Sequence, residues 1–250
     1  MTKNKKNQPV KKDTDVGEGI LSPNASWKFR DNVPEKFSAH VKRSVPLYEE
    51  GHNMVQKVSD YFVQDNSICY ELGVSTAALL KQLAQRHSKA KWVGVDIEPK
   101  MIEQAQKEIE IFDGHLSNIE LVDEDINLYS YEKSDFIVSY YTIQFVPPRL
   151  RQELLNRIYE TLNWGGAFFM FEKVRGPDAR FQDILNSLYT DFKLEQGYSS
   201  QEIIGKSRSL KGVLEPFSSQ GNLDLLSRAG FTDIMTIFKF VCFEGFLAIK

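Results

Sequence analysis

The chain has 250 residues, 42% of them hydrophobic, which suits one large α/β domain with a substantial core. Its 31 Lys and Arg residues nearly balance 34 Asp and Glu, so a net charge of -3 excludes the global positive field typical of nucleic-acid-binding proteins. No apolar stretch approaches the roughly 18 residues that cross a membrane. No metal-ligand spacing links the two cysteines, Cys69 and Cys242, or the four scattered histidines, so we expect no metal site. We expect a cytoplasmic protein in which both thiols are free.

The beginning of the chain differs in composition from the rest. Residues 1–25 are polar, lysine-rich and poor in large side chains, so they bury too little surface to offset the entropy of ordering. We predict a disordered tail there, with a nucleic-acid-binding arm as the less favoured alternative. One domain is predicted over residues 26–250.

Helical and strand periodicities alternate through that domain, as in a parallel sheet with helical crossovers. The predicted strands are 68–72, 92–97, 119–122, 135–141, 167–172, 234–240 and 243–249. Helices are predicted between them, three of which follow the fifth strand at 178–196, 199–210 and 219–229. The order predicts the α/β class, with a doubly wound, mostly parallel seven-stranded sheet and a terminal antiparallel hairpin.

Ligands of such sheets bind beyond the carboxyl ends of the strands, where this chain carries acids and a glycine. Glu71 precedes the turn Gly73-Val74-Ser75, where a carboxylate can hold a cationic amine beside a closely approaching backbone. Asp96 follows Gly73 by the distance at which an acid binds a ribose diol, and Asp125-Ile126 suits an adenine edge. Together they predict a nucleotide-like cofactor.

The glycine pattern of dinucleotide-binding folds is absent. Ser75 and Ala78 stand where the G-x-G-x-x-G motif needs glycine. NAD and FAD are therefore minor alternatives.

Several further motifs make the chain resemble the carboxy-S-adenosyl-L-methionine synthase family, bacterial enzymes similar to class I methyltransferases. The likeness covers nearly everything after the tail. It is carried by Arg43-Ser44-Val45-Pro46-Leu47-Tyr48, Tyr70-Glu71-Leu72-Gly73, Asp96-Ile97-Glu98-Pro99-Lys100-Met101, Thr142-Ile143-Gln144-Phe145, Phe171-Glu172-Lys173, Asp191-Phe192-Lys193 and Gly197-Tyr198-Ser199.

The resemblance implies a Rossmann-like class I methyltransferase fold with a helical lid at about 176–216, and a homodimer. The family makes carboxy-S-adenosylmethionine from S-adenosylmethionine (SAM) and prephenate, for later use on a tRNA wobble uridine. The cofactor contacts, some of them carried over from the family, are expected to be Tyr48, Glu71, Gly73, Val74, Ser75, Asp96, Ile97, Asp125, Ile126 and Tyr140.

Three positions depart from the family pattern. An arginine of the lid helix pairs with the extra carboxylate of the family's product, and its place is taken by Ser207, with Arg208 adjacent. Serine brings neither the charge nor the planar fork of arginine. The family's asparagine after the fourth strand is Tyr140, and its aspartate before the glycine is Glu71.

These departures favour plain SAM as cofactor and methyl transfer to a small-molecule acceptor, with carboxy-SAM synthesis as the alternative. Tyr140 and Glu172 are the candidate catalytic groups, as proton acceptors, and Tyr141 and Gln144 are candidates to orient the acceptor. Tyr141 and Glu172 could instead have purely structural roles.

An anion pocket and two other functions also stay open. Arg30, Lys42, Arg43 and Arg208 could bind an acidic co-substrate. A non-catalytic SAM-binding scaffold and a nucleic-acid modifier that uses the lysine-rich tail are the other functions. The acceptor itself has no motif in the sequence.

Overall fold

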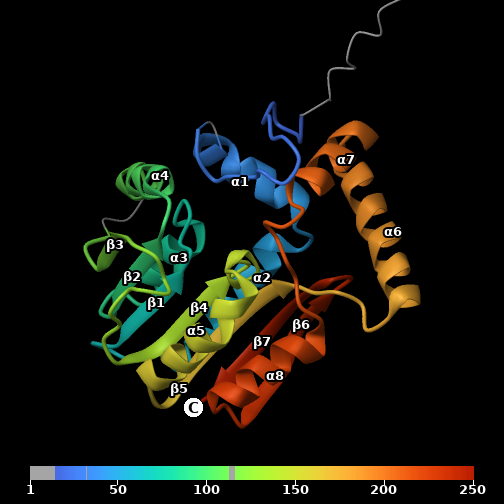
Figure 1. Cartoon of the computed structure of the whole chain (residues 1–250). Helices are drawn as coiled ribbons and strands as arrows, with labels where there is room; N and C mark the ends of the chain where they lie inside the picture. Colours follow the sequence, from blue (N-terminus) through green and yellow to red (C-terminus); the bar gives the residue numbers. More distant parts are fainter. Residues whose placement is uncertain (1–14, 32, 113–115) are drawn as a thin grey trace, which may run out of the picture.

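A single seven-stranded sheet organises the molecule (Figure 1). The computed structural model describes residues 15–31, 33–112 and 116–250. The strand order is β3-β2-β1-β4-β5-β7-β6, and only β7 runs antiparallel to its neighbours. The strands are β1 (Ile68–Leu72), β2 (Lys91–Asp96), β3 (Ile119–Asp123), β4 (Ser134–Tyr140), β5 (Leu162–Lys173), β6 (Asp233–Phe240) and β7 (Phe243–Ile249). The predicted doubly wound fold with a terminal hairpin is confirmed.

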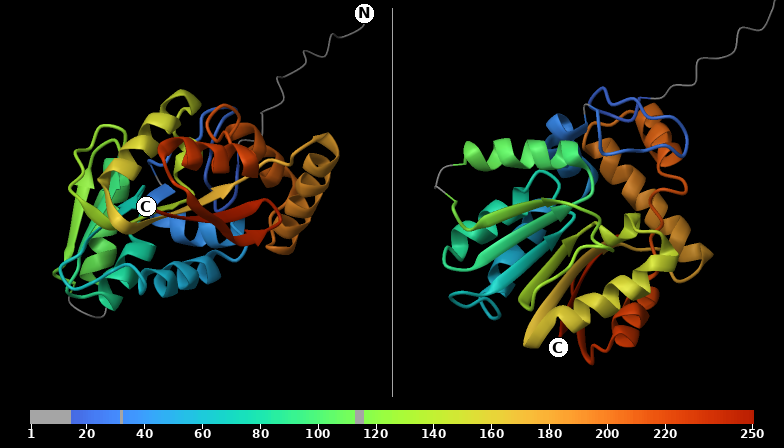
Figure 2. Two further views of the ribbon diagram at one scale, coloured as in Figure 1. Left: turned by 90° about the horizontal axis from the view of Figure 1, so that it is seen from below. Right: turned by 60° about the vertical axis from the view of Figure 1, so that its left-hand side comes forward.

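The central strands are apolar because helices cover both faces of the sheet (Figure 2). In β5, Phe168 and Met170 face one hydrophobic cluster while Phe169 and Phe171 face the other, as the period of two in a strand requires. Helices α2 (Tyr48–Ser59), α3 (Ala78–Arg86) and α4 (Pro99–Glu110) pack on the second of these faces, and α5 (Pro148–Thr161) and α8 (Ser219–Ala229) pack on the first. The sheet therefore lies between two continuous cores.

Helices precede the sheet and connect most of its strands. They are α1 (Val33–Ser44), α2 (Tyr48–Ser59), α3 (Ala78–Arg86), α4 (Pro99–Glu110), α5 (Pro148–Thr161), α6 (Ala179–Glu195), α7 (Ser200–Ser209) and α8 (Ser219–Ala229), with a 3₁₀ turn at Ile143–Phe145. Figure 1 shows the blue N-terminal part and the orange helices α6 and α7 at the same end of the molecule. None of the described helices is long and apolar enough to cross a membrane.

Strand β5 begins earlier than expected. The segment Asn163–Gly166 is typical of a helix end, yet α5 stops at Thr161 and the chain enters the sheet at once. A register irregularity against Ser134 and Phe136, with Gly165 at φ 81°, takes up the extra residues. Glycine marks this irregularity, which periodicity alone does not separate from a helix cap.

The prediction of a disordered tail is wrong for residues 15–25. Val16 and Ile20 are buried with Trp27 in a third apolar cluster that packs against α1 and α4. Burial of these few apolar side chains stabilises a segment that is otherwise polar. The rest of the predicted tail, residues 1–14, lies outside the described residues, and so do the lysines of the alternative nucleic-acid-binding arm.

Candidate functional site

The loops that follow the first four strands open onto one large cavity of about 1100 Å³. Helices α1, α6 and α7 contribute the other walls. All of the predicted site residues except Arg43 and Glu172 line it, namely Tyr48, Glu71, Gly73, Val74, Ser75, Asp96, Ile97, Asp125, Ile126, Tyr140, Tyr141, Gln144, Ser207 and Arg208. Convergence follows from the topology, because carboxyl ends of parallel strands meet at one edge of a sheet.

The turn after β1 brings a buried acid and a bare backbone to the cavity. Gly73 has φ 73°, donates its N–H to the Val95 carbonyl at 2.8 Å, and leaves no room for a Cβ beside Thr142. Glu71 is buried, and burial raises the pKa of its carboxyl well above the usual range. Within the described residues its Oε2 has no hydrogen-bond partner. A ligand ammonium group would satisfy this oxygen.

Asp96 ties two loops together at the end of β2. Its Oδ2 accepts the Ser75 N–H at 2.8 Å and its Oδ1 accepts the Glu98 N–H at 3.0 Å. Burial raises the pKa of Asp96 while these two bonds oppose the rise. Each oxygen keeps a lone pair for a ribose hydroxyl, which fits the predicted role.

An apolar slot lies beside these acids. Ile97 is 65% exposed on the cavity wall, whereas Ile126 is buried. The backbone there is set by Asp125, whose Oδ1 accepts the Asn127 N–H at 2.8 Å, and by Tyr131, whose hydroxyl donates to the Ile126 carbonyl at 2.7 Å. A flat base against Ile97 would cover this exposed side chain, so the residues present fit an adenosyl group.

Tyr140 forms part of the cavity floor and does not fit the role of proton acceptor. Its hydroxyl donates to the Tyr48 carbonyl at 2.8 Å, and its ring packs against His52 and Phe171 at centroid distances of 4.6 Å each. Burial raises the pKa of this phenol far above its ordinary value. The structure therefore assigns Tyr140 to shaping the floor, contrary to the prediction of acid–base chemistry.

Gly51 of α2 makes room for that floor. A Cβ at this position would overlap the Tyr140 hydroxyl. We expect Gly51→Ala to lower the free energy of unfolding by up to about 2 kcal/mol, since overpacking costs about 1–3 kcal/mol and the gain in helix propensity offsets roughly 1 kcal/mol of it. Urea unfolding of both chains measures this change in the free energy of unfolding. The cost should shrink in a Tyr140→Phe background, and equal costs in both backgrounds would contradict this contact.

Glu172 lies behind the cavity wall, not in it. Burial raises the pKa of its carboxyl to about 8, opposed by the nearby Arg151. Gln144 lines the cavity, and both ends of its side-chain amide bond to the backbone. Its Nε2 donates to the Tyr141 carbonyl at 2.9 Å, and its Oε1 accepts the Lys173 N–H at 3.0 Å. Because Glu172 is buried and does not line the cavity, we infer a supporting role for it in place of the predicted catalytic one.

Tyr141 sits on the cavity wall in a conformation unusual for a non-glycine residue. Its φ is 61°, and its buried hydroxyl finds no hydrogen-bond partner in the described part of the chain. Strained backbone of this kind persists where surrounding structure enforces it, and it is frequent at functional sites. Its position is compatible with the predicted acceptor contact.

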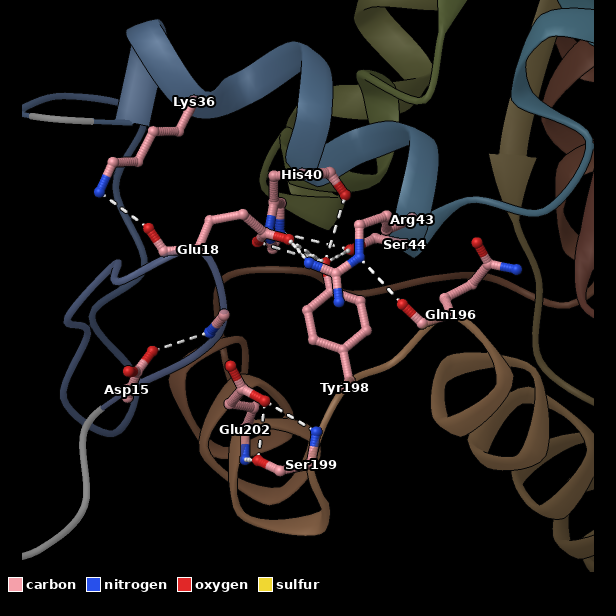
Figure 3. A network of polar contacts seen from close by, with 11 residues as sticks. Asp15, Glu18, Lys36, His40, Arg43, Ser44, Gln196, Tyr198, Ser199 and Glu202 are labelled. Carbon is pink, nitrogen blue, oxygen red and sulfur yellow. Dashed lines mark hydrogen bonds and ion pairs between the residues drawn. The ribbon is translucent and has the colours of Figure 1, made fainter.

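A network of polar contacts joins the N-terminal segment to the lid (Figure 3). The Glu18 carboxylate pairs with His40 and, at 2.6 Å, with Arg43, and it accepts the Tyr198 hydroxyl at 3.1 Å. Arg43 also donates to the Gln196 carbonyl at 3.0 Å. Arg43 thus contacts the lid, and the sequence pattern missed Glu18 because it falls in the predicted tail.

The predicted anion pocket does not form as expected. Arg30 pairs with Glu98 at 3.3 Å, Lys42 with Glu49 at 2.6 Å, and Arg43 with Glu18. Of the four predicted cations only Arg208 lines the cavity, alongside three lysines of β5, α6 and α7 that the sequence pattern did not indicate, Lys173, Lys193 and Lys206.

Comparisons with known proteins agree on the class. A family model described as "Methyltransferase domain" matches residues 70–166. The carboxy-S-adenosyl-L-methionine synthase of Staphylococcus epidermidis is 36% identical over 226 residues, covering 90% of this chain and 97% of that protein. The protein of the same name from Sulfurimonas denitrificans is also 36% identical, over 229 residues, with coverages of 90% and 94%.

Solved structures share the fold at low sequence identity. An O-methyltransferase family protein from Burkholderia thailandensis superimposes with a TM-score of 0.64 at 15% identity, over 87% of this chain and 59% of that one. Phosphoethanolamine N-methyltransferase 2 of Haemonchus contortus, solved with SAM, gives 0.62 at 14% identity, over 89% and 58%. This chain therefore spans less than two thirds of the length of either structure.

Proposed function

This chain belongs to the carboxy-S-adenosyl-L-methionine synthase family and is a SAM-dependent transferase. Within that family, we propose that this chain transfers the methyl group of SAM to a small-molecule acceptor. The observation that carries the proposal is Ser207. It occupies the place in α7 where the family resemblance implies the arginine that pairs with the carboxylate of carboxy-SAM. Ser207 lines the cavity and carries no charge of its own to pair with a second carboxylate on the cofactor, so plain SAM fits this position better.

The cofactor would be held along the first three strands. Glu71 would bind the amino group, Asp96 the ribose hydroxyls, and Asp125 with Ile97 and Ile126 the adenine. Bound SAM supplies an activated methyl on its sulfonium. The protein then mainly holds the acceptor in line and excludes water, which needs no acid or base on the cavity wall.

Carboxy-SAM synthesis from SAM and an acidic co-substrate is the second candidate. It is supported by the names of the relatives and by the lysines of the cavity, which suit an acidic co-substrate. Tyr140, in place of the family's asparagine, has its hydroxyl bonded to the Tyr48 carbonyl, which counts against that reaction because the asparagine's amide is absent.

Mass spectrometry distinguishes the two reactions. We expect SAM or its demethylated product to co-purify with the chain, and no carboxy-SAM to form from SAM and prephenate. A relative from the same family serves as the positive control for that assay. Carboxy-SAM bound to the purified protein, or formed by it, would overturn methyl transfer in favour of the second candidate.

We also propose that the chain is a cytoplasmic homodimer. A row of apolar side chains on α6 supports the dimer, because Phe181, Ile184 and Leu188 are 52%, 47% and 48% exposed at helical spacing. Two buried free cysteines are compatible with a reducing compartment.

A further inference from the structure

Two lysines contact one aromatic ring on the lid side of the cavity. The Lys173 Nζ at the end of β5 lies 4.1 Å from the centroid of the Tyr189 ring, and the Lys193 Nζ lies 4.4 Å from it. Tyr189 and Lys193 share a face of α6 because they are four residues apart. All three side chains line the cavity. We propose that this Lys173–Tyr189–Lys193 site binds a carboxylate or phosphate group of the co-substrate, a proposal that rests on the SAM-dependent transfer above.

Neither ammonium group is neutralised by the described residues. The lysines have cation–π contacts with Tyr189, but no acidic side chain in the described ranges forms an ion pair with either. Lys193 is only 8% exposed. Burial lowers the pKa of Lys193 to about 8, with Lys173 lowering it further, and burial also lowers the pKa of Lys173. Two like charges so poorly hydrated favour an anionic ligand.

The charged and titratable groups around this site strengthen the argument. Lys211 adds repulsion at Lys173, and the Cys242 thiol, the one acidic group acting on both lysines, has its pKa raised by burial and stays neutral. Lys206 also lines the cavity, and as a cation it cannot neutralise the charge of Lys173 or Lys193. The Tyr189 hydroxyl donates to the Ser44 carbonyl at 2.8 Å, which fixes the position of the ring that both lysines contact.

The site lies on the co-substrate side of the cavity. Lys173 ends β5, and β4 separates β5 from β1, which carries Glu71 and Gly73. Two strand spacings amount to roughly 10 Å, so an adenosyl group bound along β1, β2 and β3 does not reach both lysines. We assign the anion recognised here to the second substrate, for which a small acid fits better than a neutral acceptor; loss of SAM binding in the lysine variants would instead assign it to the carboxylate of SAM.

Titration calorimetry with inorganic phosphate and with malonate, at constant ionic strength, tests the site in the full-length chain. We expect saturable binding of at least one probe, weakened about tenfold by Lys193→Gln or Lys173→Gln and more by both together. Lys193→Arg, which keeps the charge, should retain most of the affinity. Lys57→Gln, at an exposed position of α2, is the matched control and should bind like the unaltered chain.

SAM binding by each variant, measured in parallel, reports folding and separates this proposal from the proposed function. If the unaltered chain binds SAM but neither probe, or if the double variant binds the probes undiminished, the anion site is overturned. If the chain binds a probe in a lysine-dependent way but not SAM, the anion site stands and the proposed function fails.

Discussion

Replacing Asp96 by alanine is expected to weaken SAM binding by about 100-fold or more. The carboxylate holds the Ser75 and Glu98 N–H groups at 2.8 and 3.0 Å, and so fixes both the turn after β1 and the entry to α4. Its loss removes the proposed ribose contact and frees two loops, each at a cost of about 1.5–3 kcal/mol for a charge-assisted bond. Titration calorimetry with SAM measures the change.

Asp123→Ala is the matched control for that experiment. Asp123 is the neighbour of Asp96 in the register of β3 on β2, but it is exposed and does not line the cavity. Its removal should leave SAM affinity within about twofold, since an exposed acid outside the cavity contributes little. The SAM affinity of Asp96→Asn should lie between those of Asp96→Ala and the unaltered chain, because the amide nitrogen cannot accept a backbone N–H. An Asp96→Ala variant that binds within a few-fold of the unaltered chain would refute the assignment.

The fold could be predicted from the sequence because its strands are compact apolar runs between helices of clear periodicity. Runs such as 68–72 and 243–249 coincide with β1 and β7 as observed, and Pro99 marks the start of α4. Helix α1 was missed because its buried residues are few and include His40, which stacks on Trp27 rather than following an apolar stripe. The apolar residues at 16 and 20 were too sparse to predict that this segment packs.

The cofactor side of the site was more predictable than the co-substrate side. Position after a parallel strand is enough to place Glu71, Asp96 and Asp125 at one edge. Side chains that meet across the lid are different, because their contacts depend on how α6 and α7 fold back over the sheet. Lys173 and Lys193 come together only through that arrangement, and Glu172 was misjudged because a strand end does not say which face its side chain occupies.

Ser207→Arg is expected to raise the affinity for carboxy-SAM by about ten- to 100-fold, and to leave the affinity for SAM within about threefold. Ser207 is exposed on the last turn of α7 and lines the cavity, so a guanidinium group introduced there has room to reach a ligand carboxylate. A bidentate arginine–carboxylate pair contributes about 1.5–3 kcal/mol. Titration calorimetry with both cofactors gives the ratio of affinities directly.

Two controls decide whether charge at position 207 is the cause. Ser207→Gln adds length without charge and should gain little, because it lacks the cationic fork. Arg208 also lines the cavity, one residue and about 100° farther round the helix, and Arg208→Ala tests whether it already fulfils this role. If the unaltered chain prefers carboxy-SAM and Arg208→Ala abolishes that preference, Arg208 takes the role of the family's arginine and pairs with the carboxylate of carboxy-SAM. Methyl transfer would then lose the observation on which it rests, because the serine at position 207 would no longer mean that the carboxylate of carboxy-SAM lacks an arginine partner.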